Sequence, residues 1–155
     1  MDKKNIEITS VKLLEKSMTI EYSHLLENRL VNGSKCIKEA PTINMLNALK
    51  YFTDQYAKIF HWEEIGEDWL KENVVATGFK LKVSGKNGDE YSCTITGKVR
   101  LESNQWIGTS TDFVPFNGNA YGITDLDKYT TELQVLMKNF FFPDLPEQKT
   151  IEETE

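Results

Sequence analysis

The 155-residue chain is poor in the residues from which catalytic and metal sites are usually built. It contains two histidines, His24 and His61, and no serine or cysteine pattern places a nucleophile beside either of them. Neither a phosphate loop ending in Gly-Lys-Ser/Thr nor the glycine fingerprint of dinucleotide sites occurs. We therefore predict no catalytic residue and no cofactor, and leave open an enzyme whose active site is assembled from distant positions.

Cysteine is equally scarce, since Cys36 and Cys93 are the only two. They lie 57 positions apart on different predicted strands, without the close spacing of a redox pair or of a zinc half-site. We interpret both as reduced, small hydrophobic residues.

Long hydrophobic runs are absent as well. The longest apolar run near a terminus, residues 140–142, is far shorter than the roughly 20 residues that span a bilayer. The N-terminal residues lead directly into a strand-like alternation, without the apolar core and cleavage site of a signal peptide. We expect a cytoplasmic protein that does not contact membranes.

The remaining composition is that of a folded domain. Hydrophobic residues make up 39% of the chain and aromatic residues 11%, which is too much apolar content for a disordered protein. The last nine residues hold four glutamates and one lysine. We expect one α+β domain over residues 1–143 and a disordered acidic tail over residues 144–155.

Period-two alternation predicts an opening hairpin over residues 6–13 and 18–22, with a bulge in its first strand. An Asn-Gly turn signal at residues 32–33 indicates a third, irregular strand within residues 24–40. A second hairpin is predicted over residues 78–101, with its turn at residues 86–89 and a bulge or bend at Gly97. A further strand within residues 106–116 ends near Pro115 or lies at an edge.

Helical spacing marks two long helices and a short one. Thr42 is placed to cap a helix that carries apolar residues from Met45 to Phe60, and residues 63–72 form a short helix or turn. Thr124 with Asp127 resembles the cap of a final helix that ends before Pro143. The predicted fold is an antiparallel sheet of five or six strands packed by two amphipathic helices, in the order two strands, a weak third strand, helix, three strands, helix.

This order of elements resembles that of small uncharacterised accessory proteins of bacteriophages. The resemblance also includes two short strings, ITGK at residues 95–98 and VPF at residues 114–116. It implies a protein that assists replication or recombination, or that blocks a host defence, and it transfers no catalytic residue.

Charge is distributed unevenly along the chain. The net charge is −6, whereas residues 78–101 hold five basic and two acidic residues, a net of +3. Cations and hydroxyls on one side of this hairpin can contact a phosphate backbone, so we predict a single-stranded nucleic acid as partner. Phe79 and Tyr91 fall on the opposite, core-facing side, so they provide no stacking surface on the polar side. The polar side can therefore also be interpreted as an ordinary solvated sheet face. The residues on the polar side are Lys80, Lys82, Thr94, Thr96, Lys98 and Arg100.

The acidic stretch 63–72 supports an alternative. It holds five acids and one lysine, but no Asp-x-Asp loop or His-x-x-Glu spacing adds ligands, so we predict no metal site there. Its acids can instead meet a basic protein partner, for example a host enzyme of nucleic-acid metabolism that the chain inhibits. An aromatic stretch from Trp106 to Tyr121 is a second candidate contact, or it simply packs on the core. The predicted partner-binding residues are Glu63, Glu64, Glu67, Asp68 and Trp106.

The sequence does not determine the oligomeric state. An edge strand would permit a homo-oligomer, but no feature of the sequence requires one.

Overall fold

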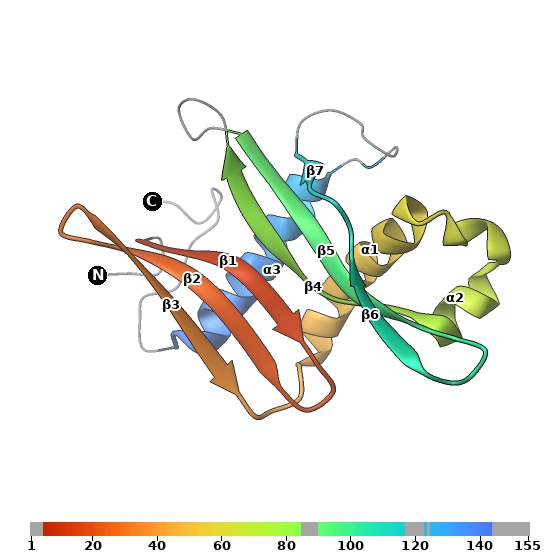
Figure 1. Cartoon of the computed structure of the whole chain (residues 1–155). Helices are drawn as coiled ribbons and strands as arrows, with labels where there is room; N and C mark the ends of the chain where they lie inside the picture. Colours follow the sequence, from red (N-terminus) through yellow and green to blue (C-terminus); the bar gives the residue numbers. More distant parts are fainter. Residues whose placement is uncertain (1–4, 85–89, 117–122, 124, 144–155) are drawn as a thin grey trace.

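A computed structural model describes residues 5–84, 90–116, 123 and 125–143. The helices follow the predicted positions, and the sheet has seven strands, of which the last has two residues. The predicted α+β class with an antiparallel sheet is confirmed (Figure 1). The elements are β1 (Ile6–Leu13), β2 (Met18–Leu26), β3 (Arg29–Ile37), α1 (Ile43–Ile59), the 3-10 helix η2 (Trp62–Ile65), α2 (Glu67–Asn73), β4 (Val74–Ser84), β5 (Glu90–Arg100), β6 (Trp106–Ser110), β7 (Val114–Pro115) and α3 (Leu126–Phe141).

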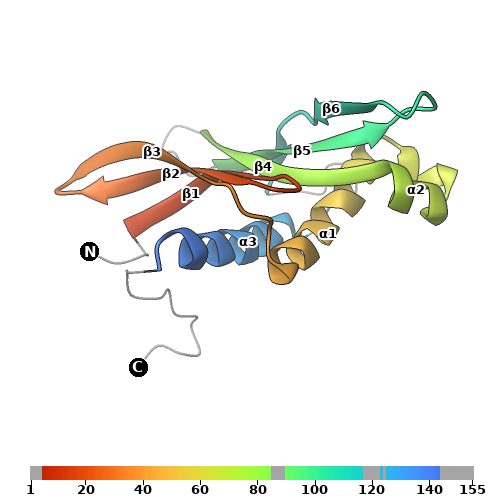
Figure 2. The ribbon, with the colours of Figure 1, turned by 90° about the horizontal axis from the view of Figure 1, so that it is seen from below.

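The two long helices cover one face of the sheet and leave the other uncovered. The strand order is β3-β2-β1-β4-β5-β6, and β7 pairs with β5. Helix α1 packs on β4 and β5, and α3 packs on β1 and on α1. Figure 2 shows both helices below the sheet, and no described helix lies above it. This uncovered side, which we call the open face, is where polar residues of the strands meet solvent.

The helices bury the apolar stripes that their spacing predicts. Thr42 is the N-cap of α1, as predicted, and its Oγ1 accepts a hydrogen bond of 3.3 Å from the backbone N–H of Met45. Phe52 stacks against Phe79 of β4, with ring centroids 5.6 Å apart. Gln134 of α3 donates a hydrogen bond of 2.7 Å to a β1 carbonyl. The most completely buried side chains therefore lie between the helices and the middle of the sheet.

Two hairpin units, one made of β1, β2 and β3 and the other of β4, β5 and β6, meet at a short junction between β1 and β4. Only three residue pairs join these strands, Ser10 with Lys80, Val11 with Phe79 and Lys12 with Gly78. A Cβ atom at Gly78 would overlap the carbonyl oxygen of Val11, so this position has no room for any side chain. The close approach of the two units depends on glycine at residue 78.

The prediction of an Asn-Gly turn at residues 32–33 is wrong, because both residues lie inside β3. The turn between β2 and β3 is at Glu27 and Asn28, which both adopt positive φ values of 48° and 66°. Gly33 lies inside β3 opposite Tyr22, where an added Cβ would meet the Tyr22 ring. The glycine therefore provides space for an aromatic ring across the strand pair.

The bulge expected at Gly97 lies in the neighbouring strand instead. The register between β4 and β5 shifts between Ala76 and Gly78, so the extra residue is Thr77. Gly97 itself is paired regularly with Ala76. Its surroundings are crowded, because an added Cβ would lie 2.9 Å from the Tyr56 ring. The Tyr56 hydroxyl reaches past it to form a hydrogen bond with Thr109 Oγ1 of β6.

Two sequence predictions fall outside the described residues, namely the hairpin turn at residues 86–89 and the acidic tail over residues 144–155. The N-cap of α3 is Asp125, one residue after the predicted Thr124, and its side chain makes no capping hydrogen bond. The pairing of Ser84 with Glu90 nevertheless confirms that β4 and β5 form a hairpin. Phe141 ends α3 before Pro143, as predicted.

We expect Gly78→Ala to lower the free energy of unfolding by about 2 kcal/mol or more, because the methyl group displaces one strand from the other. Urea unfolding followed by circular dichroism measures this change. Gly108→Ala is the matched control, because its nearest neighbour to an added Cβ lies 3.9 Å away, and we expect a change within about 0.5 kcal/mol. Equal stability of the two variants would contradict the tight junction.

Candidate functional site

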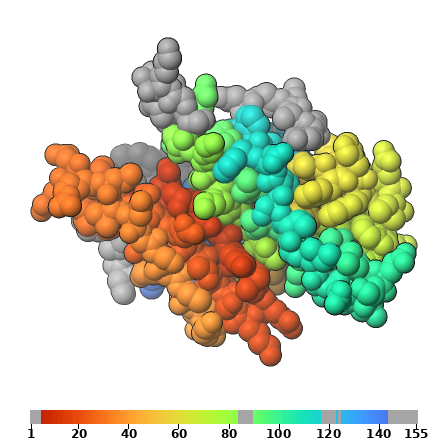
Figure 3. Space-filling view, in the orientation of Figure 1, coloured from red at the N-terminus to blue at the C-terminus, as the bar shows by residue number. Residues whose placement is uncertain are grey.

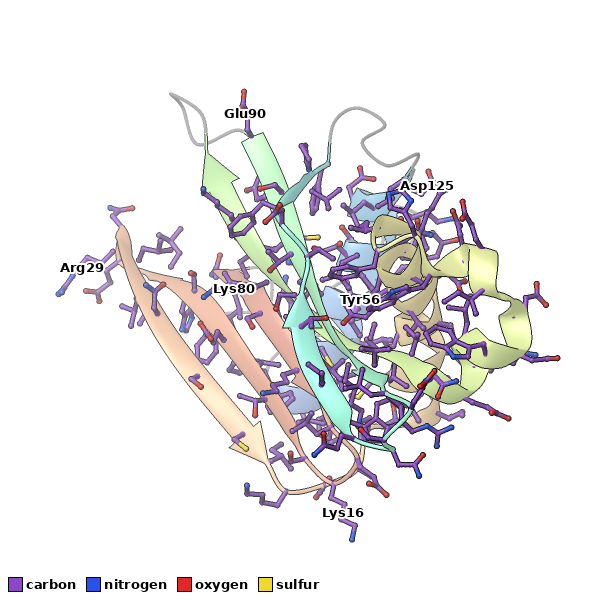
Figure 4. The ribbon with its side chains drawn as sticks, turned by 45° about the vertical axis from the view of Figure 1, so that its right-hand side comes forward. Lys16, Arg29, Tyr56, Lys80, Glu90 and Asp125 are labelled. Atoms are coloured by element: carbon purple, nitrogen blue, oxygen red, sulfur yellow. The ribbon has the colours of Figure 1, made fainter. Side chains whose placement is uncertain are left out.

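The predicted basic residues lie on the open face. Along β5 the even-numbered residues from Ser92 to Arg100 are partly exposed and the odd-numbered ones from Cys93 to Val99 are buried. Lys80 pairs with Thr94, and residues paired across an antiparallel ladder point to the same side. Figure 4 shows Lys80 over the sheet, whereas Tyr56 of α1 lies next to β5 and β6. The side assigned from the sequence to Lys80, Thr94, Thr96, Lys98 and Arg100 is therefore the uncovered one.

A hollow of about 570 Å³ occupies the middle of the open face. Strands β4 and β5 form its floor, and β1 and β6 form its two walls. In the space-filling view, which looks onto this face, it lies between the red surface of β1 and the blue-green surface of β6 (Figure 3). Its polar side chains are Ser10, Lys12, Thr77, Lys80, Thr96, Lys98 and Ser110, and Trp106 lines the β6 side.

Lys12 belongs to this site although sequence reasoning gave it no role. It is exposed on β1, and the β1–β4 junction pairs it with Gly78, two residues before Lys80. Among the described residues, neither Lys12 nor Lys80 has an ion-pair partner. The alternation of β1, in which Val11 and Leu13 are buried, places Lys12 on the open face. That Lys12 lies near Lys80 follows only from the pairing of β1 with β4, which local sequence patterns do not predict.

The bulge in β4 directs a hydroxyl into the hollow. The extra residue, Thr77, is largely buried, and its Oγ1 lies 3.4 Å from Thr96 Oγ1. Bulges commonly redirect a side chain in this way. An O–H···O bond is normally 2.5–3.0 Å long, so this contact is weak and both hydroxyls can still bind another group.

Trp106, which the sequence analysis listed with the partner-binding acids, lies beside the cations of the open face. It pairs with Arg100 across β5 and β6 and is 42% exposed. The Lys98 ammonium lies 5.0 Å from the Trp106 ring centroid, and the Arg100 guanidinium lies 5.8 Å from it. Trp106 is therefore an exposed aromatic group inside the basic surface.

A second aromatic residue follows the same pattern. Phe113 is 43% exposed, and the Lys82 ammonium lies 4.9 Å from its ring centroid. Phe116, by contrast, stacks on Tyr91 and packs against the core, as the alternative reading of this stretch predicted. Tyr121 lies outside the described residues. The aromatic stretch thus divides into two exposed rings and one packed ring.

Arg100 has a structural role besides its position on the face. Its Nε donates a hydrogen bond of 2.9 Å to Asn73 Oδ1 at the end of α2. The guanidinium therefore links the end of α2 to the Trp106 ring. Substitution of Arg100 would disturb this packing, so it is a poor position for testing binding alone.

The acidic residues form a separate surface at the end of α1. Glu63 and Glu64 lie on η2, and Glu67 and Asp68 lie in the first turn of α2, all of them exposed. No group of three His, Cys, Asp or Glu residues in the described part of the chain is arranged to hold a metal ion. Burial, and then the nearby charge of Glu67, raise the pKa of the Asp54 carboxyl beside this surface.

Both cysteines are free, as expected, but they have different environments, and the interpretation of Cys36 as a small hydrophobic residue does not fit its exposure. Cys93 is fully buried under α1, and this burial raises the pKa of its thiol to about 12. Cys36 is exposed, because β3 is an edge strand and the residue points to the open face. His61 is exposed after α1, and His24 lies on β2.

No protein-family model matches the chain, and neither a curated protein nor a solved structure shows significant similarity to it. Among the described residues, no helix has the length and apolar character needed to cross a membrane.

The cysteine environments lead to a simple expectation. At pH 8 a thiol reagent should modify Cys36 in the folded protein and leave Cys93 unmodified, because only the thiolate reacts and a pKa of about 12 keeps Cys93 protonated. Mass spectrometry after iodoacetamide treatment should show one modification in buffer and two in denaturant. Rapid double modification of the folded protein would contradict the burial of Cys93.

Proposed function

We propose that the chain is a non-catalytic accessory protein that binds single-stranded nucleic acid on its open face. The observation that supports this most is the convergence of Lys12, Lys80 and Lys98 with Trp106 around one hollow. These residues come from four strands, so their association is a property of the fold.

The charge pattern supports binding of a phosphate backbone. Between Ser92 and Arg100 the outward positions of β5 carry two cations and no acid. Acids do occur on the open face, at Glu7 and Glu21 of β1 and β2 and at Glu90 at the other end of β5. The basic surface is therefore a stripe along β4 and β5 with Lys12 at its side, bounded by acids. Such a stripe fits one strand of phosphates better than a broad duplex surface.

The aromatic residues remove the main objection to this function. Sequence parity placed Phe79 and Tyr91 toward the core, which left no ring for base stacking. Trp106 and Phe113 provide two exposed rings from the neighbouring β6–β7 segment, each within 5.0 Å of a lysine ammonium. Stacking on a side chain requires an unpaired base, so these rings favour single strands over duplex.

The resemblance to small bacteriophage accessory proteins is compatible with this role. A protein that binds single strands without catalysis fits replication or recombination, where such strands are exposed. The physical support for the proposal comes from the open face alone.

A basic protein partner is the second candidate. A groove of about 500 Å³ beside η2 and α2 is lined by Trp62, Ile65 and Trp69, and Ile65 is 55% exposed. The exposed acids Glu63 and Glu67 lie on the same two helices. An apolar groove beside negative charge suits a basic partner surface. This candidate fails if Glu63→Gln with Glu67→Gln leaves the affinity for a captured basic partner unchanged.

We expect wild-type protein to bind a labelled oligothymidylate with an affinity that falls steeply with salt, measured by fluorescence anisotropy. Lys80→Gln should weaken binding and reduce the slope of log K against log salt by about 0.7, because one phosphate contact is lost. Lys71→Gln is the matched control, since Lys71 is an exposed lysine on α2, away from the open face.

Three outcomes would contradict the proposal: no binding at low ionic strength, binding without salt dependence, or an equal loss in the Lys80→Gln and Lys71→Gln proteins. Tighter binding of duplex than of single strands would contradict the role of the aromatic residues.

A further inference from the structure

We propose that the hollow is a subsite for one nucleotide, in which Lys12, Lys80 and Lys98 bind the phosphate and Trp106 stacks on the base. This inference rests on the proposed function and deepens it, because it names the unit of ligand that the hollow accepts. A free nucleoside monophosphate should therefore bind there without a polymer.

The size of the hollow fits this ligand. Its volume of about 570 Å³ lies within the range of about 300–1,000 Å³ that is usual for small-molecule sites. A flat sheet would hold a strand only by contacts along its length. Here β1 and β6 form walls on either side of β4 and β5, so a single unit can lie between the two walls.

The three lysines reach the hollow from different strands. Lys12 comes from β1, Lys80 from β4 and Lys98 from β5, so positive charge is present on the floor and on the β1 wall. The net charge of the chain is negative, so the three lysines around the hollow form a positive region on an acidic protein. A phosphate group bears the charge that such a group of ammonium ions binds best.

Hydroxyl groups complete the polar lining. Ser10, Thr77 and Thr96 line the hollow, and the weak contact of 3.4 Å between the two threonine hydroxyls leaves them able to donate to a ligand. Uncharged donors beside cations are common partners of phosphate oxygens. The bulge at Thr77 thus adds a donor that a regular strand would not supply.

Trp106 accounts for recognition of the base. Its ring faces Lys98 in the free protein, at 5.0 Å from ammonium to centroid. A phosphate in the hollow offers the Lys98 ammonium a stronger partner than the Trp106 ring. The base can then stack on the Trp106 ring where the ammonium lay. Base stacking is generally stronger than an exposed cation–π contact, so this exchange favours the bound state.

Lys82 provides an internal control. It lies on the same face but outside the residues that line the hollow, and its ammonium contacts Phe113. A strand that continues beyond the hollow can reach Lys82, whereas a single nucleotide cannot. Lys12 and Lys82 are both exposed lysines on strands, so Lys12→Gln and Lys82→Gln are matched changes.

The test is isothermal titration calorimetry at low salt with adenosine 5′-monophosphate, with inorganic phosphate and with an oligothymidylate. We expect the nucleotide to bind more tightly than inorganic phosphate, because only the nucleotide stacks. Lys12→Gln and Trp106→Leu should each weaken nucleotide binding about fivefold or more. Lys82→Gln should leave nucleotide affinity unchanged and weaken oligonucleotide binding. Thermal unfolding of each variant verifies that the fold is intact.

The outcomes separate this inference from the proposed function. Salt-dependent oligonucleotide binding without nucleotide binding would overturn the subsite and leave the open face as a polymer-binding surface. Equal loss of nucleotide affinity in Lys12→Gln and Lys82→Gln would also overturn it, because the hollow would not be the site. Absence of binding by both ligands would contradict the subsite and the proposed function together.

Discussion

The close approach of β1 and β4 at Gly78 is the constraint on which the rest of the structure depends. Only three residue pairs join the two hairpin units, and the carbonyl of Val11 occupies the space that a side chain at residue 78 would need. The same contact brings Lys12 beside Lys80. The junction therefore unites the sheet and assembles the cations of the hollow.

The arrangement of the helices determines which surface is free to bind. Helices α1 and α3 bury one side of the sheet, and their aromatic and aliphatic residues form the core with Phe79 and Ile95. An antiparallel sheet can leave its second face to solvent when alternate residues are polar. Tyr56 extends this support to the edge, since its hydroxyl contacts Thr109 and so positions β6 as a wall of the hollow.

The fold was predictable from local patterns, and its exceptions have physical causes. Period-two and helical spacing identified the two hairpins, the two long helices and the Thr42 cap, because each depends on neighbouring residues. The single strand predicted within residues 106–116 is divided into β6 and β7. The turn signal at residues 32–33 failed because Gly33 makes room for Tyr22 on the neighbouring strand. Cys36 was interpreted as a small hydrophobic residue like Cys93, but it is exposed because β3 is an edge strand, which alternation does not reveal.

The candidate site was only partly predictable for the same reason. Parity placed Lys80 and Lys98 on one side, but it could not show that Lys12 joins them from β1. Trp106 was grouped with the acids of residues 63–68, although strand pairing places it opposite Arg100. Long-range pairing, which no local pattern encodes, converts a basic strand face into a hollow with an aromatic wall.

The most direct measurement is a two-dimensional NMR titration of the labelled protein with a short oligothymidylate, following backbone amides and the indole N–H groups of the three tryptophans. Binding on the open face predicts shifts at Lys12, Thr77 and Lys98, and at the indole of Trp106, with those of Trp62 and Trp69 unchanged. Shifts confined to the helices or to the two other tryptophans, or no shifts at low salt, would contradict binding at this face.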